Sequence, residues 1–419
     1  MDPLLMSICI VFALAGCCIG LFTGLIPGIH VNTLAAILLA LYSPLQSALI
    51  DFVPEAYTPV AVCSIIMAAS VVHSFVDFVP SVFIGAPDGE DAISVLPGHR
   101  LLLKGEGMKA VRSAAIGSLI GCSAAILLAV PMQYVMFTGL ADELDKYTKL
   151  VLLGVTALLL FNEWKKRNLI FGILAFVLSG VIGWRVMKIP IPAHELLFEG
   201  TLLMPMLTGL FGLPTMIMAS KGKPFPKQKD DVKEPNVFVP GLKGVLMGSV
   251  AGWFPGITST VGATISTTIM PDRSPERFIS TVASIGTVTT VLSLVTLSVS
   301  GGGRSGTVIV IGQILGDSIR GLATKEFMLM LLAAAIASII GYCLTIQSGK
   351  YMANRISRIS TGRVNKVIII FLVAIVLLTT GPWGLFILLC STLTGFIPVC
   401  DDNGKTTLCG CLILPVLLM

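Results

Sequence analysis

The stretch Gly20-Leu21-Phe22-Thr23-Gly24-Leu25-Ile26-Pro27-Gly28-Ile29-His30 is followed, about 230 residues later, by the related stretch Gly248-Ser249-Val250-Ala251-Gly252-Trp253-Phe254-Pro255-Gly256-Ile257-Thr258. Both lie in strongly apolar sequence. Because proline lacks a backbone donor and glycine relaxes the turn, Pro-Gly interrupts a membrane helix and frees polar backbone groups. Lipid cannot satisfy these groups. The two motifs therefore predict a pair of broken helices that face protein or a cavity.

The composition is that of an integral membrane protein. Hydrophobic residues make up 55% and charged residues 12% of the 419 residues, whereas a soluble domain carries about 25% charge. The net charge of +5 indicates no nucleic-acid partner, because basic residues in loops set membrane orientation. The ten cysteines form no C-x-x-C pair and are interpreted as buried apolar residues. We therefore predict an all-α polytopic membrane protein with no cofactor and no resident metal.

Apolar stretches of about helical length run along the whole chain, although several fall below the roughly 17 residues needed to span a bilayer. In the first half they are 4–26, 31–48, 57–80, 110–139, 148–162, 168–186 and 196–218, and in the second half 243–254, 257–270, 278–299, 326–347, 367–380, 384–397 and 406–419. This pattern predicts about five transmembrane helices and one Pro-Gly hairpin in each half.

The distribution of Lys and Arg predicts the orientation. If each Pro-Gly motif is the tip of a hairpin that returns to its own side, one side holds about three times as many basic residues as the other, which is the positive-inside bias. The central loop is then cytoplasmic and the N-terminus lies outside a cell membrane.

An odd number of crossings per half would turn the second half upside down relative to the first. We expect a first transmembrane repeat over 1–220, a cytoplasmic linker over 221–241 and an inverted second repeat over 242–419. The ends of the halves agree, because 208–218 aligns with 409–419. Inverted repeats are typical of carriers that work by alternating access, and their broken helices hold the substrate.

Polar side chains surround both predicted breaks. Side-chain oxygens and loosened carbonyls suit a transient Na⁺ ion, and the exposed N-terminus of each second half-helix suits an anionic group. The alternative is that the hydroxyls only satisfy freed backbone and allow close helix packing. The candidate binding residues are Pro27, Gly28, His30, Asn32 and Thr33 at the first break, and Pro255, Gly256, Thr258, Ser259 and Thr260 at the second.

A glycine-rich polar element follows each broken helix. The first contains Asp88, Glu90 and Asp91, which are either gating or ion-coupling carboxylates or part of a solvated turn. The second, 300–307, contains Arg304 and Ser305 and is followed by Asp317. An arginine there can bind a carboxylate with two hydrogen bonds, or it can face water outside the membrane.

His73 and Asp77 are four residues apart and can share one helix face. Ionisable groups in an apolar segment are functional candidates by default, so the pair could relay a proton. The alternative is a pair without a transport role at the end of a helix, near the lipid headgroups. His99 and His194 are interpreted as loop residues.

These motifs together resemble the permease subunit family of the tripartite tricarboxylate transporters, in its shorter, archaeal-like branch. The resemblance is carried by 24–32, 252–256, 97–107 and 209–214. It implies a permease that moves small carboxylates such as citrate with a cation gradient. It also implies a small membrane subunit and an extracytoplasmic binding protein as partners, while homo-oligomer formation stays open.

The leading hypothesis is therefore a secondary transporter for a di- or tricarboxylate coupled to Na⁺ or H⁺, and not an enzyme. The alternative is a membrane-embedded enzyme or lipid-linked substrate handler that uses Asp88, Glu90, Asp91 and Asp317. No H-E-x-x-H, G-x-S-x-G or P-loop motif occurs in the sequence.

Overall fold

The computed structural model describes residues 2–26, 31–84, 95–188, 202–219, 225–229, 235–254, 257, 259–270, 272, 274–303, 305–357, 361–400 and 405–418. No strand occurs in these ranges, which confirms the predicted all-α class. In chain order the elements are α1 (Pro3–Leu25), α2 (Val31–Ala40), α3 (Tyr42–Leu49), η1 (Glu55–Tyr57), α4 (Thr58–Val76), α5 (Phe78–Ile84), α6 (Val95–Leu103), α7 (Gly107–Val135), η3 (Met136–Leu140), α8 (Ala141–Lys146), α9 (Thr148–Lys165), α10 (Leu169–Lys188), α11 (Leu203–Leu207), η4 (Thr208–Gly212), α12 (Leu213–Ala219), α13 (Phe238–Trp253), α14 (Ser259–Ile269), α15 (Pro275–Ser300), α16 (Gly306–Leu315), η5 (Gly316–Ile319), α17 (Lys325–Ile356), α18 (Thr361–Cys400), η6 (Lys405–Cys409) and α19 (Gly410–Leu418).

The helices match the predicted apolar stretches. Within the described ranges, seven helical segments are long and apolar enough to cross a membrane. The chain is therefore a multi-pass membrane protein. The two predicted segments 367–380 and 384–397 belong to α18, whose helical geometry is interrupted at Gly381, with a φ of 64°. The sequence interpretation did not identify α6 and α16 as helices, because each is too short to span a bilayer.

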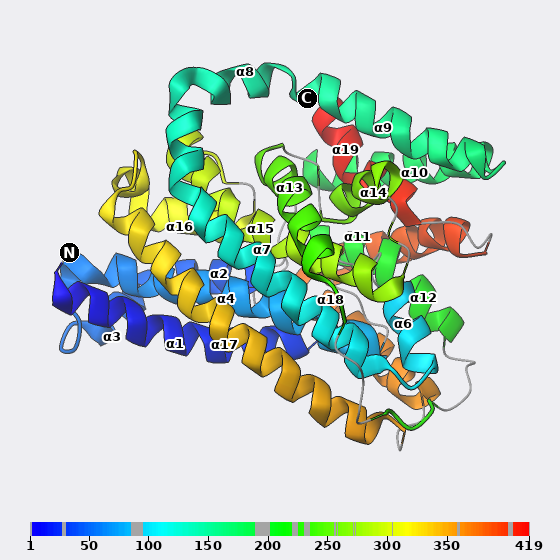
Figure 1. Ribbon diagram of the computed structural model, residues 1–419, viewed down its shortest axis with the longest axis horizontal. Helices are drawn as coiled ribbons and strands as arrows, with labels where there is room; N and C mark the ends of the chain where they lie inside the picture. The colour runs from blue at the N-terminus through cyan, green and yellow to red at the C-terminus, as the bar shows by residue number, and fades with distance from the viewer. Residues whose placement is uncertain are drawn as a thin grey trace.

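The interior consists of α4 and α15, which are surrounded by α1, α7, α13 and α17 (Figure 1). Of the 18 most apolar consecutive residues, 83% are buried in the segment that contains α4, and 78% in the segment that contains α15. The buried hydroxyls of α15 are satisfied inside the protein, as when Ser284 donates to the Gly241 carbonyl and Thr287 to the Ser118 carbonyl. The other long helices expose apolar side chains, such as Leu127 and Ile339, as a lipid-facing surface requires.

A second layer contains α9, α10, α18 and α19, at the right of Figure 1. It is assembled by contacts between the two halves of the chain. Gly209 in η4 lies against α18, where an added Cβ atom would be 2.6 Å from Ser391 Cβ. Gly410 of α19 lies against α10, where the same atom would be 2.9 Å from Ser179 Oγ. These glycines are aligned in the two halves, so the same type of contact occurs twice.

The first helix of each half is seated on a buried helix by a row of glycines at four-residue spacing. A Cβ atom added at Gly20 of α1 would lie 2.6 Å from the carbonyl oxygen of Ala69 in α4. A Cβ atom added at Gly248 of α13 would lie 2.6 Å from Val288 Cβ in α15. Small residues let membrane helices approach this closely. The rows are Gly16, Gly20 and Gly24 in α1 and Gly244, Gly248 and Gly252 in α13.

Part of the central linker is docked rather than free on the surface. Gly107 N–H donates to Gln228 Oε1 at 2.9 Å, and Lys229 N–H donates to the Gly105 carbonyl at 2.8 Å. Phe225 is buried, and its ring lies 5.4 Å from that of His99. His99 belongs to helix α6, so the prediction that it is a loop residue is wrong. The described linker residues 225–229 hold the turn between α6 and α7.

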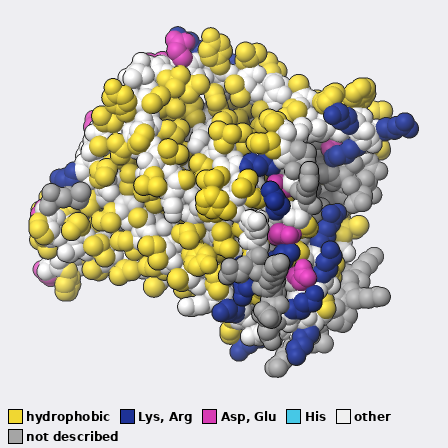
Figure 2. All heavy atoms as spheres, viewed as in Figure 1, with side chains coloured by type: hydrophobic (Ala, Val, Ile, Leu, Met, Phe, Trp, Pro, Cys, Tyr) yellow, Lys and Arg dark blue, Asp and Glu magenta, His cyan; other side chains and the backbone are white. Residues whose placement is uncertain are grey.

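Charged side chains are unevenly distributed over the visible surface. Figure 2 shows Lys and Arg gathered at one end, where α6 and the C-terminal end of α17 lie in Figure 1, and apolar side chains over much of the remaining face. This is the polarity expected for a membrane protein with one strongly basic side.

Candidate functional site

Each Pro-Gly motif separates two helices. The helix α1 ends at Leu25, after which Ile26 is extended, and α2 begins at Val31. In the second half α13 ends at Trp253, Phe254 is extended, and α14 begins at Ser259. Pro27, Gly28, His30, Pro255, Gly256 and Thr258 lie outside the described residues, as do the side chains of Thr33, Ser259 and Thr260.

The glycine rows determine where the breaks lie. Gly24, one residue before the end of α1, packs on His73 and Val76 near the C-terminal end of α4. Gly252, one residue before the end of α13, packs on Leu292 and Thr289 in α15. The two supporting helices touch, because Ser74 Oγ of α4 is 3.4 Å from Thr290 Oγ1 of α15. Both breaks thus lie beside one central pair of helices.

The first break is bordered by a buried polar group. His73 Nδ1 is 3.1 Å from Thr23 Oγ1, and the His73 side chain is 5% exposed. Asp77, 8% exposed, is the C-cap residue of α4 and donates its backbone N–H to the His73 carbonyl. Both residues are interior, where an ionisable pair is costly and usually functional. The structure therefore does not place them at an exposed helix end.

Asn32, a predicted site residue of the first half, contacts the second glycine-rich element at the start of α16. Thr307 N–H donates to Asn32 Oδ1 at 3.0 Å. Ser305 is the N-cap of α16: its hydroxyl accepts from Val308 N–H and lies 2.9 Å from Thr307 Oγ1. The N-terminal amides of a helix need such partners. The contact fixes α2 of the first half against the second glycine-rich element, although Arg304 itself lies outside the described residues.

The second break is held by α15. The Thr296 hydroxyl donates to the Gly252 carbonyl at 3.1 Å. Trp253, the next residue, is 2% exposed, and its indole Nε1 has no hydrogen-bond partner in the part of the chain that the structure describes. Trp253 lies in the second Pro-Gly stretch but is not among the binding residues that the sequence predicts. The sequence does contain a signal for Trp253: a tryptophan beside a predicted break carries an indole N–H, which needs a partner when it is buried.

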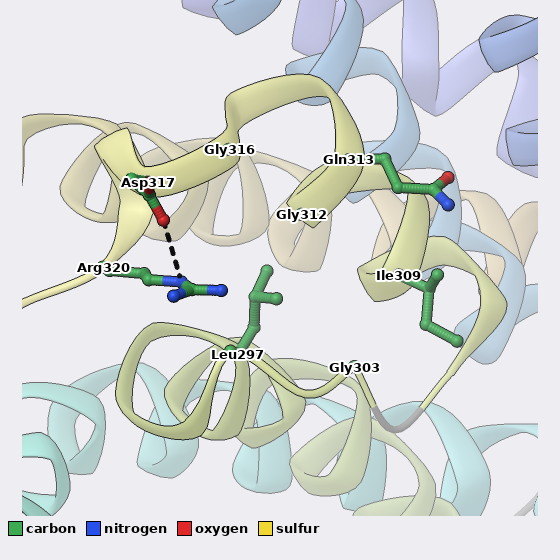
Figure 3. Close-up of a pocket in the computed structure, with 9 residues that line it drawn as sticks. Leu297, Gly303, Ile309, Gly312, Gln313, Gly316, Asp317 and Arg320 are labelled. Atoms are coloured by element: carbon green, nitrogen blue, oxygen red, sulfur yellow. Dashed lines mark ion pairs between the residues drawn. The ribbon is translucent and has the colours of Figure 1, made fainter.

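A hollow of about 280 Å³ lies between the end of α15 and α16 (Figure 3). Its polar lining residues are Gln313, Asp317 and Arg320. The dashed line in Figure 3 joins Asp317 Oδ1 to Arg320 Nε, 3.3 Å apart. The side chain of Asp317 is 90% exposed, so this carboxylate sits at the rim rather than in the interior.

The remaining predicted carboxylates, Asp88, Glu90 and Asp91, lie outside the described residues. In the part of the chain that the structure does describe, no three His, Cys, Asp or Glu side chains are grouped as a metal site would need.

An all-helical membrane protein with two interrupted helices on one central helix pair has the construction of a membrane transport protein. Comparison with known proteins identifies the family: the model of the tripartite tricarboxylate transporter TctA family matches residues 10–402. The chain belongs to this family.

Two relatives are uncharacterized proteins. One, from Methanocaldococcus jannaschii, is 26% identical over 98% of both chains. The other, from Agrobacterium vitis, is described as a 52.8 kDa protein in the TAR-I ttuC' 3' region; it is 22% identical over 59% of this chain and 50% of its own length. No solved structure matches the chain.

Proposed function

We propose that the protein is a secondary active permease for a small organic anion, a di- or tricarboxylate, driven by a Na⁺ or H⁺ gradient through alternating access. The observation that carries the proposal is the pairing of the breaks: two interrupted helices, seated by matching glycine rows, lie beside α4 and α15, which touch each other. Breaks that lie beside one interior pair of helices would expose backbone groups to a shared ligand rather than to lipid.

We also propose that the halves, 1–220 and 242–419, are inverted repeats with the linker 221–241 on the cytoplasmic side and the N-terminus outside. The recurring glycine contacts support the repeat, since Gly209 and Gly410 meet serines of the opposite half. The basic end in Figure 2 supports the orientation. In alternating access, one group of helices would rock against the other around the breaks.

The two halves carry different polar groups at matching positions, which supports a division of roles. If Gly24 and Gly252 correspond, then His73 and Asp77 in α4 correspond to Thr289 and Ser293 in α15. At these matching positions, titratable side chains border the first break and hydroxyl side chains border the second. We assign ion coupling to His73 and Asp77, with Asp88 and Asp91 as further candidates, and substrate contacts to both breaks and the Arg304–Ser305 element.

The family name contains the term tripartite, and we extend this to partners: a small membrane subunit and an extracytoplasmic binding protein. In the proposed orientation, the Asn32–Thr307 contact would hold α2 against α16 and so close the substrate path from the outside. We propose no catalytic chemistry, because a carrier returns its substrate unchanged.

Uptake of radiolabelled citrate into proteoliposomes tests the proposal. Wild-type protein should accumulate citrate when an inward Na⁺ or H⁺ gradient is imposed, and it should exchange internal for external citrate in counterflow. Pro255→Leu should abolish both activities, because leucine restores a donor and removes the break. Pro131→Leu, on the exposed face of α7, is the matched control and should transport normally.

Normal uptake by Pro255→Leu would contradict the assignment of the break. Covalent conversion of the added substrate would favour the enzyme alternative, and ion conductance far above carrier rates would indicate a channel.

A further inference from the structure

Within the described residues, the indole N–H of Trp253 is a buried donor without an acceptor. Trp253 is the last residue of α13, directly before the second break, and it is 2% exposed. The indole nitrogen can only donate, and a buried tryptophan N–H almost always has a partner. A donor left unsatisfied in the interior destabilises the fold and calls for an explanation.

Among the described residues, no acceptor lies within hydrogen-bond distance of the Trp253 indole nitrogen. It belongs to an apolar cluster that also contains Phe254, Ile257 and Val261, all at most 8% exposed. The indole N–H makes no hydrogen bond to the Thr296 hydroxyl, which donates to the Gly252 carbonyl. Because that bond also anchors the end of α13, the indole is attached to a well-supported segment and can serve as a preorganised donor.

Helix packing does not require an indole at this position. In the first half the residue that follows the last glycine of the row is Leu25, and in the second half it is Trp253. Leucine performs the same apolar role at the end of α1. The second half thus carries an additional hydrogen-bond donor at its break, whereas the first half carries the titratable pair His73 and Asp77.

We propose that Trp253 Nε1–H donates a hydrogen bond to a carboxylate oxygen of the transported anion. The proposal rests on the proposed function and adds a specific substrate contact to it. A carboxylate offers only acceptors, and a hydrogen bond to a charged acceptor is stronger than one between neutral groups. The apolar surroundings strengthen it further, because water does not compete for the donor. Bound substrate would therefore satisfy the donor that the protein leaves unpaired.

The test compares the purified full-length wild-type protein with Trp253→Phe, which keeps an aromatic ring and removes only the donor side of the indole. Citrate is the probe, and thermal unfolding is measured over a range of citrate concentrations. The melting temperature without citrate does not decide the proposal, because phenylalanine removes an unsatisfied donor but also leaves a cavity. Its dissociation constant for citrate should rise about ten- to a hundredfold. A structural role alone would leave citrate affinity unchanged.

Trp383→Phe is the matched control. Trp383 is 61% exposed and makes an edge contact with Phe386, so this variant should bind citrate like wild type. If Trp253→Phe binds citrate within about twofold of wild type, the Trp253 contact is refuted while the permease assignment stands. If wild type neither binds nor transports citrate, the proposed function is refuted, and the contact with it.

A second measurement decides the case in which Trp253→Phe does not fold. The chain has four tryptophans, so a variant with Trp164→Phe, Trp184→Phe and Trp383→Phe keeps Trp253 as the sole indole fluorophore. Citrate should then shift its emission, because a hydrogen bond to the indole N–H changes the excited state. Unchanged emission at saturating citrate would overturn the proposal.

Discussion

Replacing Gly20 with alanine tests whether the glycine row of α1 positions the first break. The added Cβ atom would lie 2.6 Å from the Ala69 carbonyl oxygen, which is about 0.8 Å less than the 3.4 Å at which ordinary van der Waals contact begins. The next nearest atoms, Ala69 Cα at 2.9 Å and Val72 Cβ at 2.9 Å, belong to backbone or a stiff side chain. The strain can be relieved only if α1 moves away from α4.

The expected change in the free energy of unfolding follows from two opposing effects. Overpacking of this kind costs about 1–3 kcal/mol, whereas alanine is favoured over glycine in a helix by up to about 1 kcal/mol. Gly154→Ala in α9 is the matched control, because an added Cβ atom there meets nothing within 4 Å. Both variants gain the same helix propensity, so the difference between their stabilities, about 1–3 kcal/mol, isolates the clash.

The assay is thermal unfolding in detergent, followed by citrate uptake in proteoliposomes. Gly20→Ala should melt below Gly154→Ala, and its uptake should fall, because a shift of about 1 Å in a site can cost a hundredfold in rate. Gly248→Ala, whose Cβ atom would also meet its neighbour at 2.6 Å, should behave like Gly20→Ala. Equal melting temperatures for Gly20→Ala and Gly154→Ala would refute the reasoning.

Two further predictions concern the side with the basic end. Asp272→Asn removes the charge that faces Lys243 Nζ at 2.9 Å, in a pair whose side chains are only 9% and 5% exposed. Because the lysine charge is then buried without compensation, the free energy of unfolding should fall by about 3–5 kcal/mol. Thermal melts should show that Lys243→Met combined with Asp272→Asn recovers part of this loss. Burial lowers the pKa of His99 from its usual 6.5, so below about that pH the unfolded state binds more protons and stability falls as pH decreases. His99→Phe should remove this dependence between about pH 5 and pH 7, and an unchanged dependence would assign it to another group.

Much of the fold follows from one-dimensional features of the sequence. Long apolar runs predict helices such as α1, α15 and α17, because a membrane span needs about 20 consecutive apolar residues. Pro27-Gly28 and Pro255-Gly256 predict the ends of α1 and α13, because a missing donor is a local property of the chain. The order of these motifs was also enough to indicate the TctA family, which the match over residues 10–402 confirms.

Other features depend on contacts between distant residues and could not be predicted. The short helices α6 and α16 have no spanning length, and Gln228 docks against Gly107 across more than a hundred residues. Asn32 was selected for its position beside a break, but its partner Thr307 is 275 residues away.

The sequence by itself thus determined that this is a polytopic helical membrane protein with two broken helices, because apolar length and proline geometry are local. Only the tertiary structure decided that His73 and Asp77 are interior, that Asp317 is at the surface, and that Trp253 keeps an unpaired donor. Burial and hydrogen-bond satisfaction are properties of packed neighbours, and the sequence does not state which neighbours a side chain will have.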